Sequence, residues 1–101
     1  MSDKEKTRMS PTIRAFSDED HRNLDIEIEL PGVEKKDIDL KIHEDSFYLT
    51  APRENVVYVA NYGTCCPVDP SKAKATYKNG LLTIVVPFLE IKEKHIKVDV
   101  K

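Results

Sequence analysis

Hydrophobic and polar residues alternate along most of this chain. In the first clear run, apolar residues occupy the even positions from Leu24 to Leu30 and carboxylates the odd ones. A period of two places the apolar side chains on one face of a strand and the carboxylates on the other, in water. Pro31 and Gly32 follow and end the run. The pattern predicts a half-buried strand over residues 24–30.

Three further segments carry the same signal between short polar turns. They are residues 38–43, 47–51 and 56–65, and Gly63 interrupts the last of them. Each has apolar or aromatic residues at alternate positions, which is typical of strands that pack one face against a core. We therefore predict a strand in each.

Asn79 and Gly80 mark the clearest turn of the chain. They separate two more alternating runs, residues 73–78 and 81–86. Asn and Gly best tolerate the positive φ that a type I′ turn requires at both central positions. The pair therefore predicts a β-hairpin, and Pro87, which has no backbone N–H, ends its second strand.

These elements together predict an all-β protein. No segment combines helical periodicity, a cap and a long stretch free of the six prolines and three glycines. Seven to eight short strands joined by short turns are typical of an immunoglobulin-like antiparallel β-sandwich. We expect a disordered polar arm over residues 1–11, the sandwich over residues 12–87, and a C-terminal extension over residues 88–101.

Composition limits the partners. With 101 residues the chain is one domain, and its 16 basic and 18 acidic residues are interspersed, for a net charge of −2. A surface without a basic patch has no electrostatic footprint for nucleic acid or anionic lipid. The start has no apolar stretch typical of a secretory signal, and no apolar run is long enough to span a membrane. We expect a cytoplasmic protein.

The residues suited to catalysis or metal binding are few. None of the five serines lies in a G-x-S-x-G sequence, and most carboxylates are on outward strand faces. The metal-ligating candidates are Cys65, Cys66 and three histidines, His21, His43 and His95. Adjacent strand residues point to opposite faces, so the two cysteines are not expected to share a metal. We expect one buried thiol and one near the surface, and no enzyme activity, metal or cofactor.

The apolar candidates are more informative. Ala73 and Ala75 occupy inward-facing strand positions where larger residues would pack better. Either they pack against the aromatic residues 47–48, or they leave a groove between two sheet edges. Ile96 and Val98 also have two interpretations: a last strand of the chain's own sandwich, or a ligand that binds a groove by strand addition.

Two segments resemble the α-crystallin domain of the small heat-shock proteins: ELPGVEKKDIDLKI, residues 29–42, and AKATYKNGLLTIVVP, residues 73–87. The second is the more specific, since it holds the family's A-x-x-x-N-G-(V/L)-L pattern from Ala75 to Leu82. PVDPSK, residues 67–72, is similar to the loop that precedes this hairpin in the family. The resemblance covers residues 12–101.

The resemblance implies an ATP-independent holdase without a cofactor, which binds exposed apolar segments of unfolding proteins and prevents their aggregation. Its implied partners are unfolded or partly folded clients and further copies of the chain. In the family a groove between two edge strands receives the C-terminal I-x-I/V motif of another subunit. The matching groove residues are Ile38, Leu40, Ile42, Ala73, Ala75 and Tyr77, and the matching motif residues are Ile96 and Val98.

The chain departs from the family in two ways. Only residues 52–55 separate two strands where many members carry a long loop whose strand is exchanged between partners, and the N-terminal arm is short and polar. We therefore expect a dimer or small oligomer, any dimer pairing residues 56–65 edge to edge, and weaker holdase activity than in long-armed members.

The alternative within the same architecture is a CS-domain-like co-chaperone, or an adaptor that binds one partner by edge-strand pairing. The I-x-V motif after an Asn-Gly hairpin favours the small heat-shock class.

Overall fold

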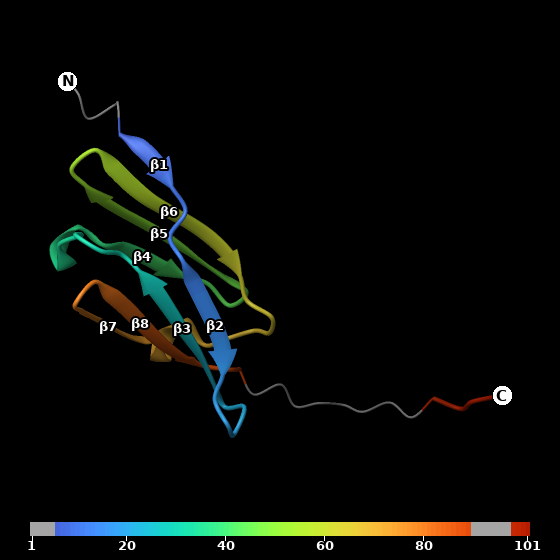
Figure 1. Ribbon diagram of the computed structural model, residues 1–101. Coiled ribbons are helices and arrows are strands. Elements are labelled where there is room, and N and C mark those ends of the chain that lie inside the picture. Colours follow the sequence, from blue (N-terminus) through green and yellow to red (C-terminus); the bar gives the residue numbers. More distant parts are fainter. Residues whose placement is uncertain (1–5, 90–97) are drawn as a thin grey trace.

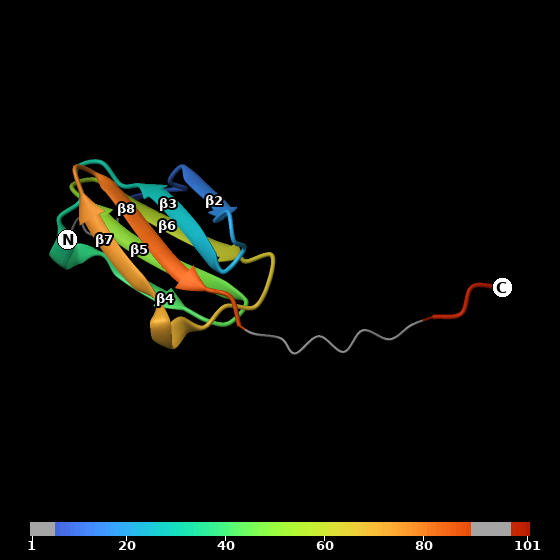
Figure 2. The same cartoon turned by 90° about the horizontal axis from the view of Figure 1, so that it is seen from below.

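The computed structural model describes residues 6–89 and 98–101, which form two four-stranded sheets packed face to face (Figures 1 and 2). One sheet has the strand order β1-β6-β5-β4 and the other β2-β3-β8-β7. The strands are β1 (Thr7–Met9), β2 (Ile13–Ser17), β3 (Asn23–Glu29), β4 (Asp39–Ile42), β5 (Ser46–Arg53), β6 (Val56–Gly63), β7 (Lys74–Lys78) and β8 (Leu81–Pro87). Two 3-10 turns, η2 (Lys35–Asp37) and η3 (Pro70–Lys72), lead into β4 and β7. The predicted all-β sandwich is confirmed.

The core lies between the sheets and follows the predicted period of two. In β3 the side chains of Leu24, Ile26 and Ile28 are buried, while the carboxylates between them are not. Phe47 and Leu49 of β5 face them from the other sheet and are also buried. Each such side chain contributes about 1.5–3 kcal/mol on burial, so the alternation fixes which face of each strand points inward.

The Asn-Gly hairpin is confirmed in detail. Asn79 has a φ of 52° and Gly80 a φ of 81°, the positive values that a type I′ turn needs. Lys78 pairs with Leu81 across the turn, and Leu30 N–H donates to the Gly80 carbonyl at 2.7 Å. The turn thus joins β7 to β8 and also holds the end of β3.

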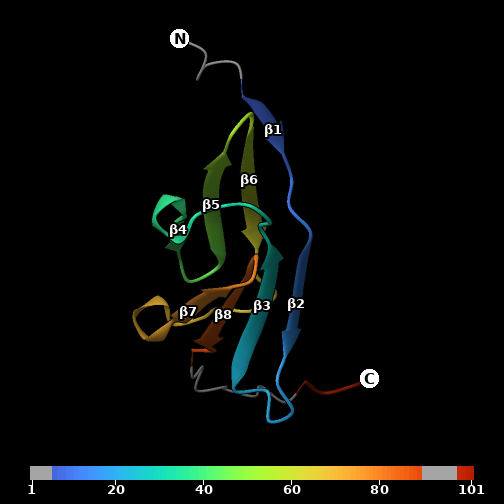
Figure 3. The ribbon, with the colours of Figure 1, turned by 60° about the vertical axis from the view of Figure 1, so that its left-hand side comes forward.

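The N-terminal part differs from the prediction. Thr7–Met9, assigned to the disordered arm, form β1, which pairs in parallel with Val56–Tyr58 of β6. Ile13–Ser17, for which no strand was predicted, form β2 against β3. All three side chains of β1 are exposed, so its strand is made by backbone pairing to a free edge and leaves no hydrophobic pattern. Figure 3 shows β1 and β2 following one another along one side of the sandwich, on different sheets.

The C-terminal extension begins after β8. Residues 98–101 belong to no strand, and Val98 and Val100 are 75% and 94% exposed. Val98 and Val100 therefore do not support the alternative of a last strand of the chain's own sandwich. Ile96 lies outside the described residues. Strand β1 extends the sandwich beyond the predicted start at residue 12, and the predicted end at residue 87 stays a prediction. In the described part of the chain, no helix is long and apolar enough to cross a membrane.

Candidate functional site

Within residues 6–89 and 98–101, two strand edges without a pairing partner lie on the same side of the sandwich. Strands β4 and β7 are each the last strand of their sheets, and β1 and β2 occupy the opposite side (Figures 2 and 3). An edge strand presents unpaired N–H and C=O groups that can pair with another extended segment. This side of the molecule therefore offers two backbone templates, one from each sheet.

The β4 edge supplies three half-buried apolar side chains. Leu40 pairs in register with Leu49, and Ile42 pairs with Phe47, both residues of the core. Leu40, Ile42 and Ile38, which stands just before β4, all pack against that core while remaining partly exposed. They face inward, and they are incompletely covered because β4 ends its sheet.

The β7 edge has smaller side chains on its inner face. Ala75 pairs with the fully buried Ile84, and Tyr77 pairs with Leu82, so both face the interior. Ala73 and Tyr77 are half-buried and pack against the core. Ala75 faces the same way and yet is exposed. Since its methyl group is on the inner face, the described residues leave the space above it uncovered.

Tyr77 holds one end of this side together. Its hydroxyl oxygen lies 2.7 Å from the carbonyl oxygens of both Leu30 and Val33. A hydroxyl has one hydrogen and donates to one carbonyl at a time. Either bond ties β7 to the loop after β3, which continues through η2 into β4. The two partners lie 44 and 47 residues from Tyr77 in the chain, and no local pattern in the sequence predicts this contact.

Asp69 shapes the entry to β7 at the other end. Its carboxylate accepts hydrogen bonds from Ser71 N–H at 3.1 Å and from the Ser71 hydroxyl at 2.6 Å, which caps η3. The hydrogen bond from Ser71 lowers the pKa of Asp69 below its ordinary value, and Lys72 adds a smaller effect in the same direction. The charged form of Asp69 therefore supports the turn that positions Ala73.

The structure thus brings the predicted β4 and β7 residues to one side, but it leaves the motif residues apart. Ile96 is outside the described residues, and Val98 is exposed. The binding of the motif to this side stays a prediction.

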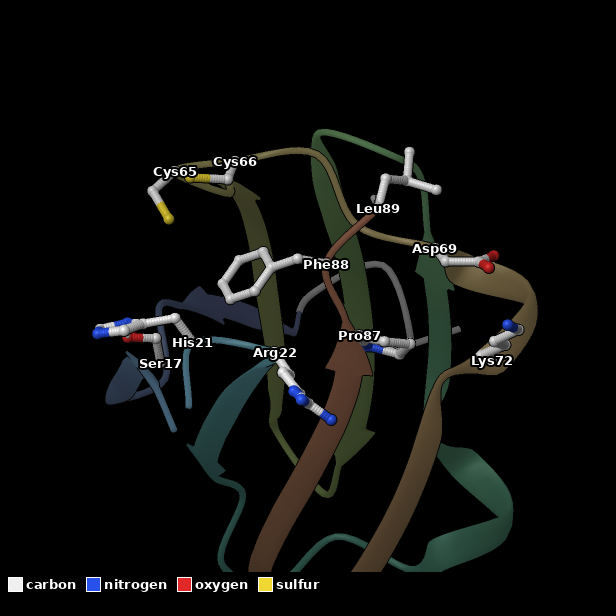
Figure 4. A pocket seen from close by; sticks show the side chains of 10 residues that line it. All are labelled: Ser17, His21, Arg22, Cys65, Cys66, Asp69, Lys72, Pro87, Phe88 and Leu89. Atoms are coloured by element: carbon white, nitrogen blue, oxygen red, sulfur yellow. Dashed lines mark hydrogen bonds between the residues drawn. The ribbon is translucent and has the colours of Figure 1, made fainter. Parts of the chain in front are cut away.

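A second feature lies at the end of the sandwich where β8 leaves it. Figure 4 shows a hollow there that includes His21, Cys65, Cys66 and Phe88. Both cysteines are exposed, so the expectation of one buried thiol is wrong. The prediction that the two cysteines point to opposite faces assumed that the strand over residues 56–65 continues as far as Cys65. That strand ends at Gly63, and both cysteines stand at a bend.

The histidines do not join the cysteines in a larger cluster. Among residues 6–89 and 98–101, no group of three or more His, Cys, Asp or Glu side chains is arranged to hold a metal. His21 contacts the hydroxyl of Ser17 through Nδ1 at 3.1 Å. His95 lies outside the described residues.

Comparisons with known proteins agree with this fold. A model of the Hsp20/alpha crystallin family matches residues 16–101. The chain is 26% identical to the "Probable 15 kDa heat shock protein" of Leptospira interrogans, over 94% of this chain and 83% of the relative. It is also 26% identical to "Heat shock protein 16" of Schizosaccharomyces pombe, over 92% and 76%.

Solved structures show the same architecture. Heat shock protein 16.0 from Schizosaccharomyces pombe matches with a TM-score of 0.73 at 19% identity, covering 93% of this chain and 77% of that one. A small heat-shock protein from Xylella fastidiosa matches with a TM-score of 0.68 at 14% identity, covering 91% and 98%. At these identities the likeness shows a shared fold.

Proposed function

Because this chain belongs to the Hsp20/alpha crystallin family, whose members are chaperones, we propose that it is an ATP-independent holdase. It would bind exposed apolar segments of unfolding proteins and keep them from aggregating. The observation that carries the proposal is Ala75, an inward-facing residue left exposed between two free strand edges.

The chemistry of this side suits an extended apolar segment. Such a segment adds as a strand to a free edge, its backbone pairing with the edge and its alternate side chains entering the space between the sheets. The inward-facing residues of the two edges are Ala75 on β7, and Leu40 and Ile42 on β4. Each buried apolar side chain contributes about 1.5–3 kcal/mol, and ordering a flexible segment offsets much of it. Binding is therefore weak and reversible, as a holdase that later releases its client requires.

The C-terminal motif is a second proposed occupant of the same side. Ile96 and Val98 are two residues apart, so an extended chain presents both to one face while Lys97 points to water. The motif of the same or another copy would then compete with clients for the β4 and β7 edges.

Self-association is proposed to be limited to a dimer or a small oligomer. Strand β1 already pairs with Val56–Tyr58, so it occupies the first part of the β6 edge. A dimer that pairs β6 with β6 would use residues 59–63 or would displace β1.

Small heat shock chaperones are in general not enzymes, and we propose the same of this chain. We also propose that it works in the cytoplasm, because Cys65 and Cys66 are free and exposed, and exposed thiols persist in reducing compartments.

The test is thermal aggregation of a model client at several chaperone ratios, with and without ATP. Suppression that is independent of ATP is expected. Ala75→Trp should fill the proposed binding space and abolish most of the suppression. Thr76→Trp is the matched control, because it adds the same side chain to the same strand on the outer face.

No suppression by the wild-type chain, even at several-fold excess, would overturn the holdase proposal and favour an adaptor that binds one partner by strand pairing. Equal loss in both tryptophan variants would show that the inner face of β7 is not the binding surface.

A further inference from the structure

Cys65 and Cys66 form a pair of adjacent thiols for which the proposed chaperone activity has no use. They stand after the end of β6, and both are free and exposed. The neighbouring Cys65 thiol raises the pKa of Cys66 above its ordinary value. Two free thiols adjacent in the chain are therefore exposed at one bend of the described structure.

The loop that carries the pair is held on both sides. Before it, Thr64 N–H donates to the Asp45 carbonyl at 2.9 Å, and after it, Val68 N–H donates to the Glu44 carbonyl at 2.7 Å. The Thr64 hydroxyl also donates to the Cys66 carbonyl at 2.9 Å. These bonds fix the backbone around the two thiols before any ligand arrives.

The surroundings leave room for a ligand. The thiols border the hollow at this end of the sandwich, which Phe88 and His21 also line (Figure 4). Phe88 is fixed there by its N–H, which donates to the Arg22 carbonyl at 2.8 Å. A small organic substituent carried by a ligand on the thiols can thus lie in a partly apolar hollow.

The covalent geometry selects the ligand. Adjacent Cα atoms are about 3.8 Å apart, closer than the roughly 4.4–6.8 Å usual for a disulfide. An atom inserted between the two sulfurs enlarges the ring and relieves this constraint. A structural zinc ion needs four ligands, and among the described residues no group of three or more His, Cys, Asp or Glu is arranged to hold a metal. A soft centre that makes three bonds fits two thiols together with one further group carried by the ligand.

We propose that Cys65 and Cys66 are a dithiol binding site for trivalent arsenicals. With an arsenic oxide R–As=O, two S–As bonds form and the arsenic–oxygen bond breaks. The two thiol protons leave with that oxygen as one water molecule, and the organic group R stays on arsenic. The oxidation state of arsenic and of both sulfurs is unchanged, so no oxidant or reductant is consumed.

The experiment uses the reduced, folded full chain and phenylarsine oxide as the probe. One equivalent should add a mass equal to phenylarsine oxide less one water, and both thiols should then fail to react with a colorimetric thiol reagent. A small competing dithiol should restore both. Neither readout depends on chaperone activity, so failure here leaves the proposed function untouched.

Matched variants decide whether adjacency matters. Cys65→Ser and Cys66→Ser each leave one thiol, and two-point attachment raises affinity by about 10²–10⁴-fold, so both should bind the arsenical at least a hundred-fold more weakly. The double variant C66S/S71C keeps two exposed thiols but separates them, and it should bind like the single variants. Binding of the double variant as tight as wild type, uptake of two arsenicals per wild-type chain, or cross-linking of two chains by one arsenical would overturn the proposal.

Discussion

Tyr77→Phe tests whether one hydroxyl fixes the two free edges relative to each other. The change removes a single oxygen atom and keeps the ring, which packs against the core. In the wild-type chain that hydroxyl lies 2.7 Å from the carbonyls of both Leu30 and Val33. In Tyr77→Phe the Leu30 carbonyl still accepts a longer hydrogen bond, from Val33 N–H at 3.3 Å. The Val33 carbonyl loses its hydrogen bond from Tyr77 and is therefore the more affected of the two.

The magnitude follows from these bonds. A hydrogen bond contributes about 0.5–1.5 kcal/mol net, and a buried group left without a partner costs about 1–3 kcal/mol. The Tyr77 hydroxyl is in a part-buried position, where water can replace part of the interaction, so the expected loss in free energy of unfolding is about 1–2 kcal/mol. In a domain of this size each kcal/mol lowers Tm by about 4–8 °C.

The assay is urea and thermal unfolding followed by circular dichroism. Tyr48→Phe is the matched control, because Tyr48 is 38% exposed and the same atom is removed there. Its stability should stay within about 0.5 kcal/mol of wild type, as for most surface changes. If Tyr77→Phe is as stable as Tyr48→Phe, the hydroxyl does not hold β7 to the loop after β3, and the reasoning fails.

Three further predictions concern a turn, two carboxylates and the N-terminal strand. Gly80→Ala should lower the free energy of unfolding by about 1–2 kcal/mol, because the φ of 81° is strained for an L-residue; denaturant unfolding measures this, and an unchanged midpoint would contradict it. Hydrogen bonds from Asn23 and Arg22 lower the pKa of Asp18, and one from Ser71 lowers that of Asp69. Both carboxylates therefore stabilise the fold at pH values above their unfolded pKa near 3.8, and they lose that contribution as the pH falls through their folded pKa. The Tm should drop on acidification, and it should drop less in the double variant Asp18→Asn/Asp69→Asn. Deleting residues 1–10 should free the whole β6 edge and raise the light-scattering mass; an unchanged mass would show that β1 does not limit pairing there.

The sequence predicted those parts of the fold that depend on local rules. Alternation identified β3 because burial of Leu24, Ile26 and Ile28 requires a period of two. Asn79 and Gly80 identified the hairpin because few residue pairs accept two positive φ angles. Both signals lie within a few residues of the chain.

The parts that were missed depend on contacts between distant segments. Strand β1 exists through backbone pairing with Val56–Tyr58, and its exposed side chains give no pattern. The bond from Tyr77 to the loop after β3 needs the folded sandwich to bring its partners together. The expected burial of one cysteine was wrong because the predicted strand was extended past Gly63 to Cys65, whereas β6 ends at Gly63 and both thiols are exposed.

The two sides of the sandwich differ in which strands form their edges. On one side β1 pairs with part of β6 and β2 pairs with β3, so the edges of β6 and β3 are covered there by the chain's own N-terminal strands. On the opposite side, β4 and β7 keep their outer edges free within the described residues, and η2 and η3 stand just before them. The inner faces there carry half-covered Leu40 and uncovered Ala75. Within the described residues, unpaired backbone and incompletely covered inward-facing apolar side chains thus coincide on the β4 and β7 side, and that coincidence is what an extended apolar segment requires.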